Sequence, residues 1–294
     1  MTAPLPVRDG VGPSTVLLPA GNWHTVLAFL IARFADVAPA IWQRRIARGD
    51  VRDEHGEPVM LDTPYQAGIC VCYYRELDDE PEIPFEASVI YRDEHVLIAD
   101  KPHFLPVTPS GRFLHQTLLV RLKKAYGLDE LVPLHRIDRG TAGLVLFSLN
   151  PTTRGLYQSL FPRREIQKVY RALAPSVPTS QLPVTRRSRM VEGEPFFRMR
   201  EVEGTPNSET HIAELQRFDQ YSLYALEPVT GKKHQLRVHL AALGAPILND
   251  RFYPDVLPDA VDDFERPLKL LAYSLAYIDP LTRRQQRFES SRTL

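Results

Sequence analysis

The most informative hydrophobic pattern in the chain lies between residues 131 and 147, where two apolar runs flank a polar segment. Apolar runs at 131–134 and 144–147 predict two buried strands, and the segment between them contains a histidine, two arginines and Asp138 before two glycines close it. Because core strands hold both ends of this loop, its polar side chains have little freedom, and catalytic groups are commonly placed on such loops. A turn whose aspartate hydrogen-bonds its own backbone explains the same pattern without any chemistry.

The chain after residue 87 mixes strand and helix patterns. Leu236, Leu240 and Leu243 recur at i, i+4 and i+7 and predict a helix with one buried stripe, beside which Arg237 lies. Asn150-Pro151 predicts the start of a helix that ends near residue 160, since asparagine caps helices and proline fits the first helical position. We expect the remaining strands at 88–91, 95–99, around 170, 211–215, 221–226, 268–278 and 286–290, and the remaining helix at 114–126.

The first 80 residues predict a small α/β domain. Asn22 can cap a helix over 25–34, a second helix covers 40–47, and short strands follow, the last at 69–74. Residues 76–84 combine acidic residues with two prolines, as linkers do. The chain is therefore expected to form one domain over 1–80 and a larger one over 81–294.

Composition allows one sizeable core and a smaller module but indicates no particular partner. The 294 residues are 44% hydrophobic and carry a formal net charge of zero. The charge is unevenly distributed, because the first 100 residues contain 8 Lys/Arg and 16 Asp/Glu, and the remainder contains 28 and 20. This asymmetry is typical of a chain with a nucleic-acid-facing part, although two ordinary solvated surfaces explain it equally well.

Cysteine usage and the N-terminus bear on the cellular compartment. Cys70 and Cys72 are too few for a disulfide framework or a zinc site, so we expect both to be reduced. The N-terminus lacks the basic start and apolar run of a signal peptide, and no apolar stretch reaches membrane-spanning length. We therefore expect a soluble, cytoplasmic protein without membrane contact.

Basic and aromatic residues interleave over 163–200. The segment contains nine Lys/Arg and three Asp/Glu, with Tyr170, Phe196 and Phe197 among them. This mixture suits an RNA backbone and unstacked bases. An exposed hairpin with an arginine-rich tip is the open alternative.

Four blocks of the sequence resemble the RluA-type RNA pseudouridine synthases. His135-Arg136-Ile137-Asp138 followed by Thr141-Ala142-Gly143-Leu144 is similar to the family's catalytic signature, His-Arg-Leu-Asp and then Thr-Ser-Gly-Leu. Residues 96–102 resemble the family's entry strand and Lys-Pro turn, 168–170 its Lys-x-Tyr strand, and 230–239 its block Thr-Gly-Arg-Thr-His-Gln-Ile-Arg-Val-His. The blocks follow the family's order over roughly 140 residues, so the resemblance is specific.

The resemblance implies a fold for each part of the chain. The catalytic domain is expected to be α+β, with a mixed, largely antiparallel sheet of the pseudouridine synthase type and flanking helices. The N-terminal domain resembles a degenerate α-L RNA-binding domain. Arg44, Arg45 and Arg48 at helical spacing would contact the RNA there, but their acidic surroundings leave an inert packing module as an equal alternative.

The implied reaction converts uridine to pseudouridine within RNA: the N-glycosidic bond breaks, the uracil turns over and its carbon 5 rejoins the sugar. By family position, Asp138 is the ionised carboxylate near the sugar. Arg237 is the cation that offsets the desolvation of Asp138, paired with it in two-point geometry. Tyr170 completes the catalytic set, since its ring can stack on the uracil and its phenol can handle the carbon 5 proton.

The resemblance also implies four residues at the substrate. Arg136 would enter the RNA where the target base was, which is useful because extruding a base costs about a few kcal/mol. His135 and Lys168 would lie beside the substrate, and Ile247 would supply an apolar floor to the pocket.

RNA, either rRNA or tRNA, is the expected partner, bound by a monomer that needs no cofactor and no metal. His234 and His239 are five residues apart, unlike the i, i+4 pair of a zinc helix, so hydrogen bonds are expected of them instead. Two other functions stay open: a catalytically silent RNA-binding or ribosome-assembly protein on the same scaffold, and a hydrolase of small glycosides, for which no second carboxylate is evident. The target uridine also stays open, as does whether Asp138 attacks the sugar or removes one of its protons.

Overall fold

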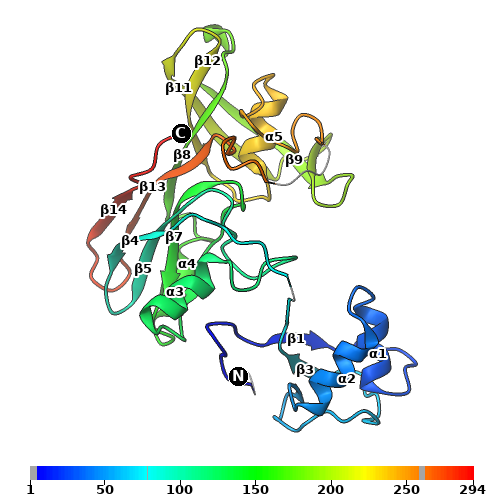
Figure 1. Ribbon diagram of the computed structural model, residues 1–294. Helices are drawn as coiled ribbons and strands as arrows, with labels where there is room; N and C mark the ends of the chain where they lie inside the picture. Colours follow the sequence, from blue (N-terminus) through cyan, green and yellow to red (C-terminus); the bar gives the residue numbers. More distant parts are fainter. Residues whose placement is uncertain (1–4, 78, 258–261) are drawn as a thin grey trace. The chain divides into compact units, whose positions relative to one another are not determined.

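The computed structural model describes residues 5–77, 79–257 and 262–294, and the chain divides into two units (Figure 1). The first unit extends to residue 81 and also includes 110–115 and 120–129. The second unit comprises 82–109, 116–119 and 130–294. No helix in the described part of the chain is both long and apolar enough to cross a bilayer.

The first unit places two helices, α1 (Val26–Arg33) and α2 (Pro39–Ala47), beside a small antiparallel sheet. The sheet has the order β1 (Ser14–Leu17), β3 (Cys70–Tyr73), β2 (Val51–Asp53). Its core contains Phe29 and Leu30 from α1 and Trp42 from α2. Helix α1 starts later than predicted because Thr25, not Asn22, is its cap: the Thr25 hydroxyl accepts a 3.1 Å hydrogen bond from the Ala28 N–H.

Arg44 and Arg45 of α2 and Arg48 directly after it are occupied by ion pairs within the first unit. Arg45 is buried, and its Nε lies 3.7 Å from a carboxylate oxygen of Glu76. Arg48 hydrogen-bonds both Glu76 and Asp50, and Arg44 lies 3.8 Å from Glu76. The predicted linker thus supplies the carboxylate that neutralises this cluster. The resemblance of this unit to an α-L domain stays a prediction.

The second unit is built on a mixed, largely antiparallel sheet, which confirms the expected α+β fold. Within the described residues the sheet has eleven strands in the order β10-β9-β11-β12-β8-β13-β7-β5-β4, with β14 paired to β13 and β6 paired to β7. The pairing of β7 with β13 is parallel, and the other recorded strand pairs in this sheet are antiparallel. The bounds are β4 Ser88–Arg92, β5 Val96–Lys101, β6 Val132–Pro133, β7 Ala142–Ser148, β8 Gln167–Pro175, β9 Val184–Glu192, β10 Met199–Val202, β11 Ser208–Arg217, β12 Tyr221–Pro228, β13 Leu270–Ile278 and β14 Gln285–Glu289.

The helices after residue 100 are α3 (Leu118–Tyr126), α4 (Arg154–Ser159), the short 3-10 helix η1 (Thr179–Gln181) and α5 (Gln235–Ala242). Helix α5 packs against β10, β11 and β12 (Figure 1). Its Leu236 and Leu240 join Ala172 and Leu226 in one buried cluster, as the predicted apolar stripe requires.

Two predicted helices begin later than the sequence pattern indicated. Leu114 and His115 donate their backbone N–H groups to the Glu80 carboxylate, so helix α3 begins only at Leu118. The Asn150 side chain accepts from the backbone N–H and the hydroxyl of Thr152, which forms a turn in place of the predicted cap. The predicted strand at 131–134 also shortens to the two residues of β6.

Gly143 sets how closely the two central strands approach each other. It lies in β7 opposite Ala272 of β13 and has φ +108°, a left-handed value that favours glycine. A Cβ at this position would lie 2.2 Å from the Ala272 carbonyl oxygen. The parallel pair next to the Asp138 loop therefore depends on the absence of a side chain.

Replacing Gly143 by alanine is expected to lower the free energy of unfolding by about 3 kcal/mol or more, since it combines backbone strain with a clash against main-chain atoms. Urea unfolding followed by fluorescence measures this loss. Gly155→Ala is the matched control, because Gly155 lies in α4 with no atom within 4 Å of its added Cβ; it should raise stability by about 0.5 kcal/mol. Equal effects of the two substitutions would contradict the close-approach argument.

Candidate active site

A cavity of about 570 Å³ is bordered by the loop after β6, by β8 and by the loop that leads into α5. It brings together Asp138, Tyr170 and Arg237, although Asp138 and Arg237 are 99 residues apart in the chain. The lining residues are His135, Arg136, Ile137, Asp138, Thr141, Phe161, Pro162, Arg164, Ile166, Lys168, Tyr170, Pro228, Val229, Thr230, Gly231, Lys232, Lys233, His234, Gln235, Leu236, Arg237 and Leu270.

One oxygen of the Asp138 carboxylate is held by the protein and the other is not. Oδ2 accepts a 3.1 Å hydrogen bond from Nη1 of Arg237. Within the described residues Oδ1 accepts no hydrogen bond, and the Asp138 side chain is 30% exposed while that of Arg237 is 7% exposed. The free oxygen can therefore meet a molecule that enters the cavity.

The two-point partner of Arg237 is Asp250 and not Asp138, which corrects the predicted pairing. Nε and Nη2 of Arg237 donate to the two oxygens of Asp250 at 2.7 and 2.6 Å. The Asp250 side chain is completely buried and also accepts the backbone N–H groups of Phe252 and Tyr253. One edge of the guanidinium is thus occupied by Asp250, and only Nη1 is directed to Asp138.

The guanidinium of Arg237 stays protonated although it is buried. Burial by itself would lower the pKa of the guanidinium, but the hydrogen bonds and negative charge of Asp250, reinforced by Asp138, raise the pKa above its usual value. A guanidinium that keeps its charge can stabilise the negative charge of Asp138 in the cavity.

His234 is a second neighbour of Asp138, with Nε2 3.8 Å from Oδ2. It is buried, directly precedes α5 and has a left-handed φ of 55°. Burial lowers the pKa of His234 to about 4, although the nearby Asp138 charge opposes the shift. The imidazole is therefore neutral at pH 7, and Arg237 is the cation in contact with Asp138.

Tyr170 and Lys168 project into the same cavity from β8. The pKa of the Tyr170 phenol is raised by burial and then by the Asp138 charge, so the phenol is neutral at pH 7. Its hydroxyl has no hydrogen-bond partner among the described residues. Burial lowers the pKa of Lys168.

His135 and Arg136 lie in the loop that carries Asp138 and have different surroundings. The Nε2 atom of His135 accepts a 3.0 Å hydrogen bond from the backbone N–H of Leu146 in β7, which ties the loop to the sheet. Burial, followed by the charge of Lys168, lowers the pKa of His135 to about 3. Arg136 is exposed at the edge of the cavity.

Ile247 does not line the cavity, contrary to its predicted place in the pocket floor. It is buried in the same apolar cluster as Leu236 and Leu270, and these two residues do line the cavity. Leu236 of α5 and Leu270 of β13 therefore supply apolar lining of the cavity, which had been expected of Ile247.

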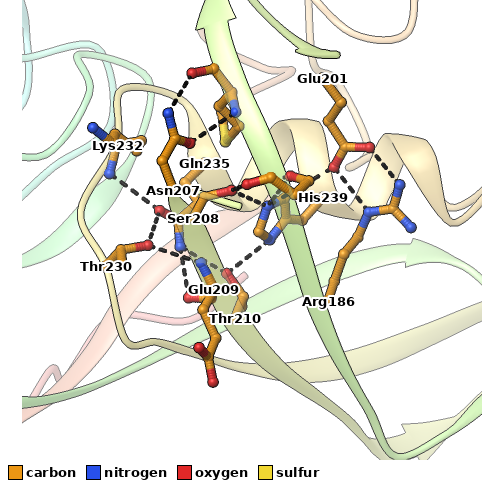
Figure 2. A network of polar contacts seen from close by, with 12 residues as sticks. Arg186, Glu201, Asn207, Ser208, Glu209, Thr210, Thr230, Lys232, Gln235 and His239 are labelled. Atoms are coloured by element: carbon orange, nitrogen blue, oxygen red, sulfur yellow. Dashed lines mark hydrogen bonds and ion pairs between the residues drawn. The ribbon is translucent and has the colours of Figure 1, made fainter. Parts of the chain in front are cut away.

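A buried polar network fixes α5 on the sheet (Figure 2). The Gln235 side chain donates to the carbonyl of Glu209 and the hydroxyl of Thr210, and it accepts from the hydroxyl of Thr230. His239 is fully buried, with Nδ1 2.9 Å from the Thr210 hydroxyl and Nε2 within 3.1 Å of the hydroxyls of Ser188 and Ser208. The expectation that His239 makes hydrogen bonds is confirmed.

Two site residues, Asp250 and Tyr253, were missed by the sequence analysis. Both follow α5 in a segment without regular secondary structure, so no periodicity marked them. The available signal was a carboxylate soon after a buried arginine, since a buried guanidinium needs an anion to offset its desolvation.

Comparisons with known proteins show which family this chain resembles. A family model described as RNA pseudouridylate synthase matches residues 95–242. An uncharacterized RNA pseudouridine synthase of Synechocystis is 33% identical over 234 residues, which is 78% of this chain and 79% of that protein. The dual-specificity RNA pseudouridine synthase RluA of Pasteurella multocida is 29% identical over 218 residues, 69% of this chain and 92% of that protein.

A solved structure shares the fold. The human protein "RNA Pseudouridylate Synthase Domain Containing 1" superposes with a TM-score of 0.59 at 25% sequence identity, covering 73% of this chain and 86% of that chain.

Asp250→Asn is expected to lower the free energy of unfolding by about 3 kcal/mol, because it leaves the buried Arg237 charge without its main counterion. Asp138→Asn should cost about 1 kcal/mol or less, since Asp138 is partly exposed and makes a single bond to the same arginine. Urea unfolding of both variants at pH 7 makes the comparison. If Asp138→Asn proved the more damaging, Asp250 would not be the main counterion.

Stability should fall as the pH drops from 6.5 to about 4. Burial lowers the folded-state pKa values of His234 and His239 to about 4, whereas an unfolded chain protonates histidine near pH 6.5. In this window the unfolded state binds the extra protons, so each histidine should reduce the free energy of unfolding by about 1 kcal/mol per pH unit. Urea unfolding at pH 7, 6 and 5 measures the slope. His239→Asn should make the slope shallower, and an unchanged slope would contradict the assignment.

Proposed function

Because this chain belongs to the RluA-type RNA pseudouridylate synthase family and isomerises uridine to pseudouridine in RNA, we propose that Asp138 is its catalytic carboxylate and that its substrate is a uridine in structured rRNA or tRNA. The observation that carries the proposal is the Asp138 carboxylate itself, which lies beside the cavity with one oxygen on Arg237 and the other without a partner in the described part of the chain.

The arrangement suits chemistry on a ribose. A carboxylate that acts on the sugar must stay ionised after RNA displaces water from the cavity, and the charged Arg237 supplies the stabilisation. Hydrogen bonding to Oδ2 also restricts rotation of the carboxylate and leaves Oδ1 for the substrate. Both proposed routes, attack on the sugar and removal of a sugar proton, need such an oxygen.

Tyr170 is proposed as the partner of the base. Its ring lies in the cavity with Asp138, and a neutral phenol can stack on a uracil without a charge penalty. Its hydroxyl has no partner among the residues that the structure describes, so it is available near carbon 5 when the proton leaves that atom.

The edge of the cavity provides cations for the RNA backbone. Arg164, Lys232 and Lys233 are exposed there, as is Arg136. Exposed cations bind phosphates at little cost in desolvation, whereas buried Arg237 is committed to carboxylates. We assign Arg136 to the space left by the extruded base, Lys168 to the substrate, and His135 to holding the loop in place. We also propose that the protein works in the cytoplasm as a monomer and uses neither a metal nor a cofactor.

Asp138→Asn and Asp138→Ala are expected to lower kcat for pseudouridine formation by about 10⁴-fold or more, because each removes the group that acts on the sugar. The measurement is pseudouridine mapping of total RNA, first from cells with and without the gene and then in vitro on the RNA so identified. Binding of that RNA should change by less than about threefold, since the cations at the cavity edge remain.

Asp219→Asn serves as the control, because Asp219 is exposed in the turn between β11 and β12. It should retain full activity. Persistent isomerisation by the Asp138 variants would show that another group acts on the sugar.

A further inference from the structure

The hydroxyl of Tyr253 connects the backbone of β10 to His234. Tyr253 is 4% exposed, and its hydroxyl lies 2.8 Å from the backbone nitrogen of Met199 and 2.9 Å from Nδ1 of His234. These are its two recorded hydrogen-bond partners among the described residues.

The first of these contacts decides the direction of the second. The Met199 N–H can only donate, so the Tyr253 oxygen accepts there and its own proton remains to be placed. A buried hydroxyl proton without an acceptor is unfavourable, and Nδ1 of His234 is the acceptor within reach. Nδ1 therefore carries a lone pair, and in a neutral imidazole the proton must then be on Nε2.

This tautomer determines what Asp138 meets. Nε2 of His234 lies 3.8 Å from Oδ2 of Asp138. With the proton on Nε2, the carboxylate faces the positive end of an N–H dipole. With the proton on Nδ1, a lone pair would face a carboxylate oxygen and repel it from its position on Arg237.

Packing holds Tyr253 and His234 in this relation. The ring of Phe252 lies 5.7 Å from the His234 ring, and Arg237 lies 5.3 Å from the Tyr253 ring centre. Arg198, next to Met199, lies over the same tyrosine ring, 4.9 Å from its centre. The tyrosine is thus fixed by its ring and acts by its hydroxyl.

We propose that Tyr253 is a positioning residue of the isomerisation, which holds His234 as the Nε2–H tautomer and so keeps Asp138 aligned on Arg237. The inference rests on the proposed role of Asp138. It assigns a function to a side chain that does not itself line the cavity.

The test is Tyr253→Phe, which keeps the ring and removes the hydroxyl. Tyr224→Phe is a closely matched control: the Tyr224 hydroxyl is also buried, accepts a backbone N–H from Val177 and donates to the carbonyl of Pro175, but it does not line the cavity. Both variants lose one bridging hydroxyl, so a merely structural loss should affect them alike.

Two readouts separate positioning from stability. Long-range ¹⁵N NMR of histidine-labelled protein reports the tautomer of His234, assigned with His234→Asn, which tolerates the left-handed backbone. In the wild type we expect the Nε2–H form, and in Tyr253→Phe a mixture of tautomers. Steady-state kinetics should show kcat reduced by about tenfold with KM within about twofold, and Tyr224→Phe should change neither.

A double-mutant cycle tests whether the effect of Tyr253 on kcat passes through His234. In the His234→Asn background, Tyr253→Phe should lower kcat no further, because its effect passes through His234. Full additivity overturns the proposal, and so does an Nδ1–H tautomer in the wild type, a measurement that requires no variant to fold. The NMR measurement requires no RNA. It can therefore refute the tautomer proposal separately from the activity assay that tests the role of Asp138.

Discussion

The structure of the site depends on one buried positive charge shared between two carboxylates. An isolated guanidinium in the position of Arg237 would be very costly to desolvate. Asp250 removes that cost with two hydrogen bonds from a completely buried side chain. The remaining N–H then holds Asp138, so the three groups together keep one negative charge, and that charge lies on the partly exposed member.

The sheet holds the loop of Asp138 at residues both before and after the aspartate. Before Asp138 in the chain, His135 is hydrogen-bonded to the backbone of β7. After Asp138 in the chain, the carbonyl of Arg139 is held by Lys101 at the end of β5, which is fully buried and also donates to the carbonyls of Pro102 and Leu105. Three carbonyl acceptors satisfy the lysine, while burial lowers its pKa well below the usual value. A carboxylate on a loop tied in this way needs little further ordering when a substrate arrives.

The sequence predicted the parts of this arrangement that have a local signature. Strands β5, β7 and β12 were expected from their apolar patterns, whereas the strand around Tyr170 and the mixed, largely antiparallel sheet followed from the family resemblance. Helix starts were less predictable, because Asn150 accepts a backbone N–H in a local turn that competes with capping, and Glu80 accepts backbone N–H groups from a distant part of the chain. For the pairing of Arg237 with Asp250 the sequence offered only the general need of a buried arginine for an anion, because the choice of carboxylate depends on how the segment after α5 folds back on that helix.

The sequence of helix α5 revealed only one of the faces that the helix buries. Residues from Gln235 to Leu240 are all buried, so the helix has no solvent-facing polar side over this stretch. Leu236 and Leu240 form the apolar stripe, which periodicity detects. Gln235 and His239, four residues apart, share a second face that binds the network of Figure 2, and Arg237 projects from a third face to the carboxylates. A polar residue on a helix ordinarily indicates exposure, but here each buried polar group has a specific partner. Because the same short helix is fixed by one polar face and holds Asp138, the proposed catalytic carboxylate, with another, displacement of the anchoring network would move Arg237 and with it the partner of Asp138.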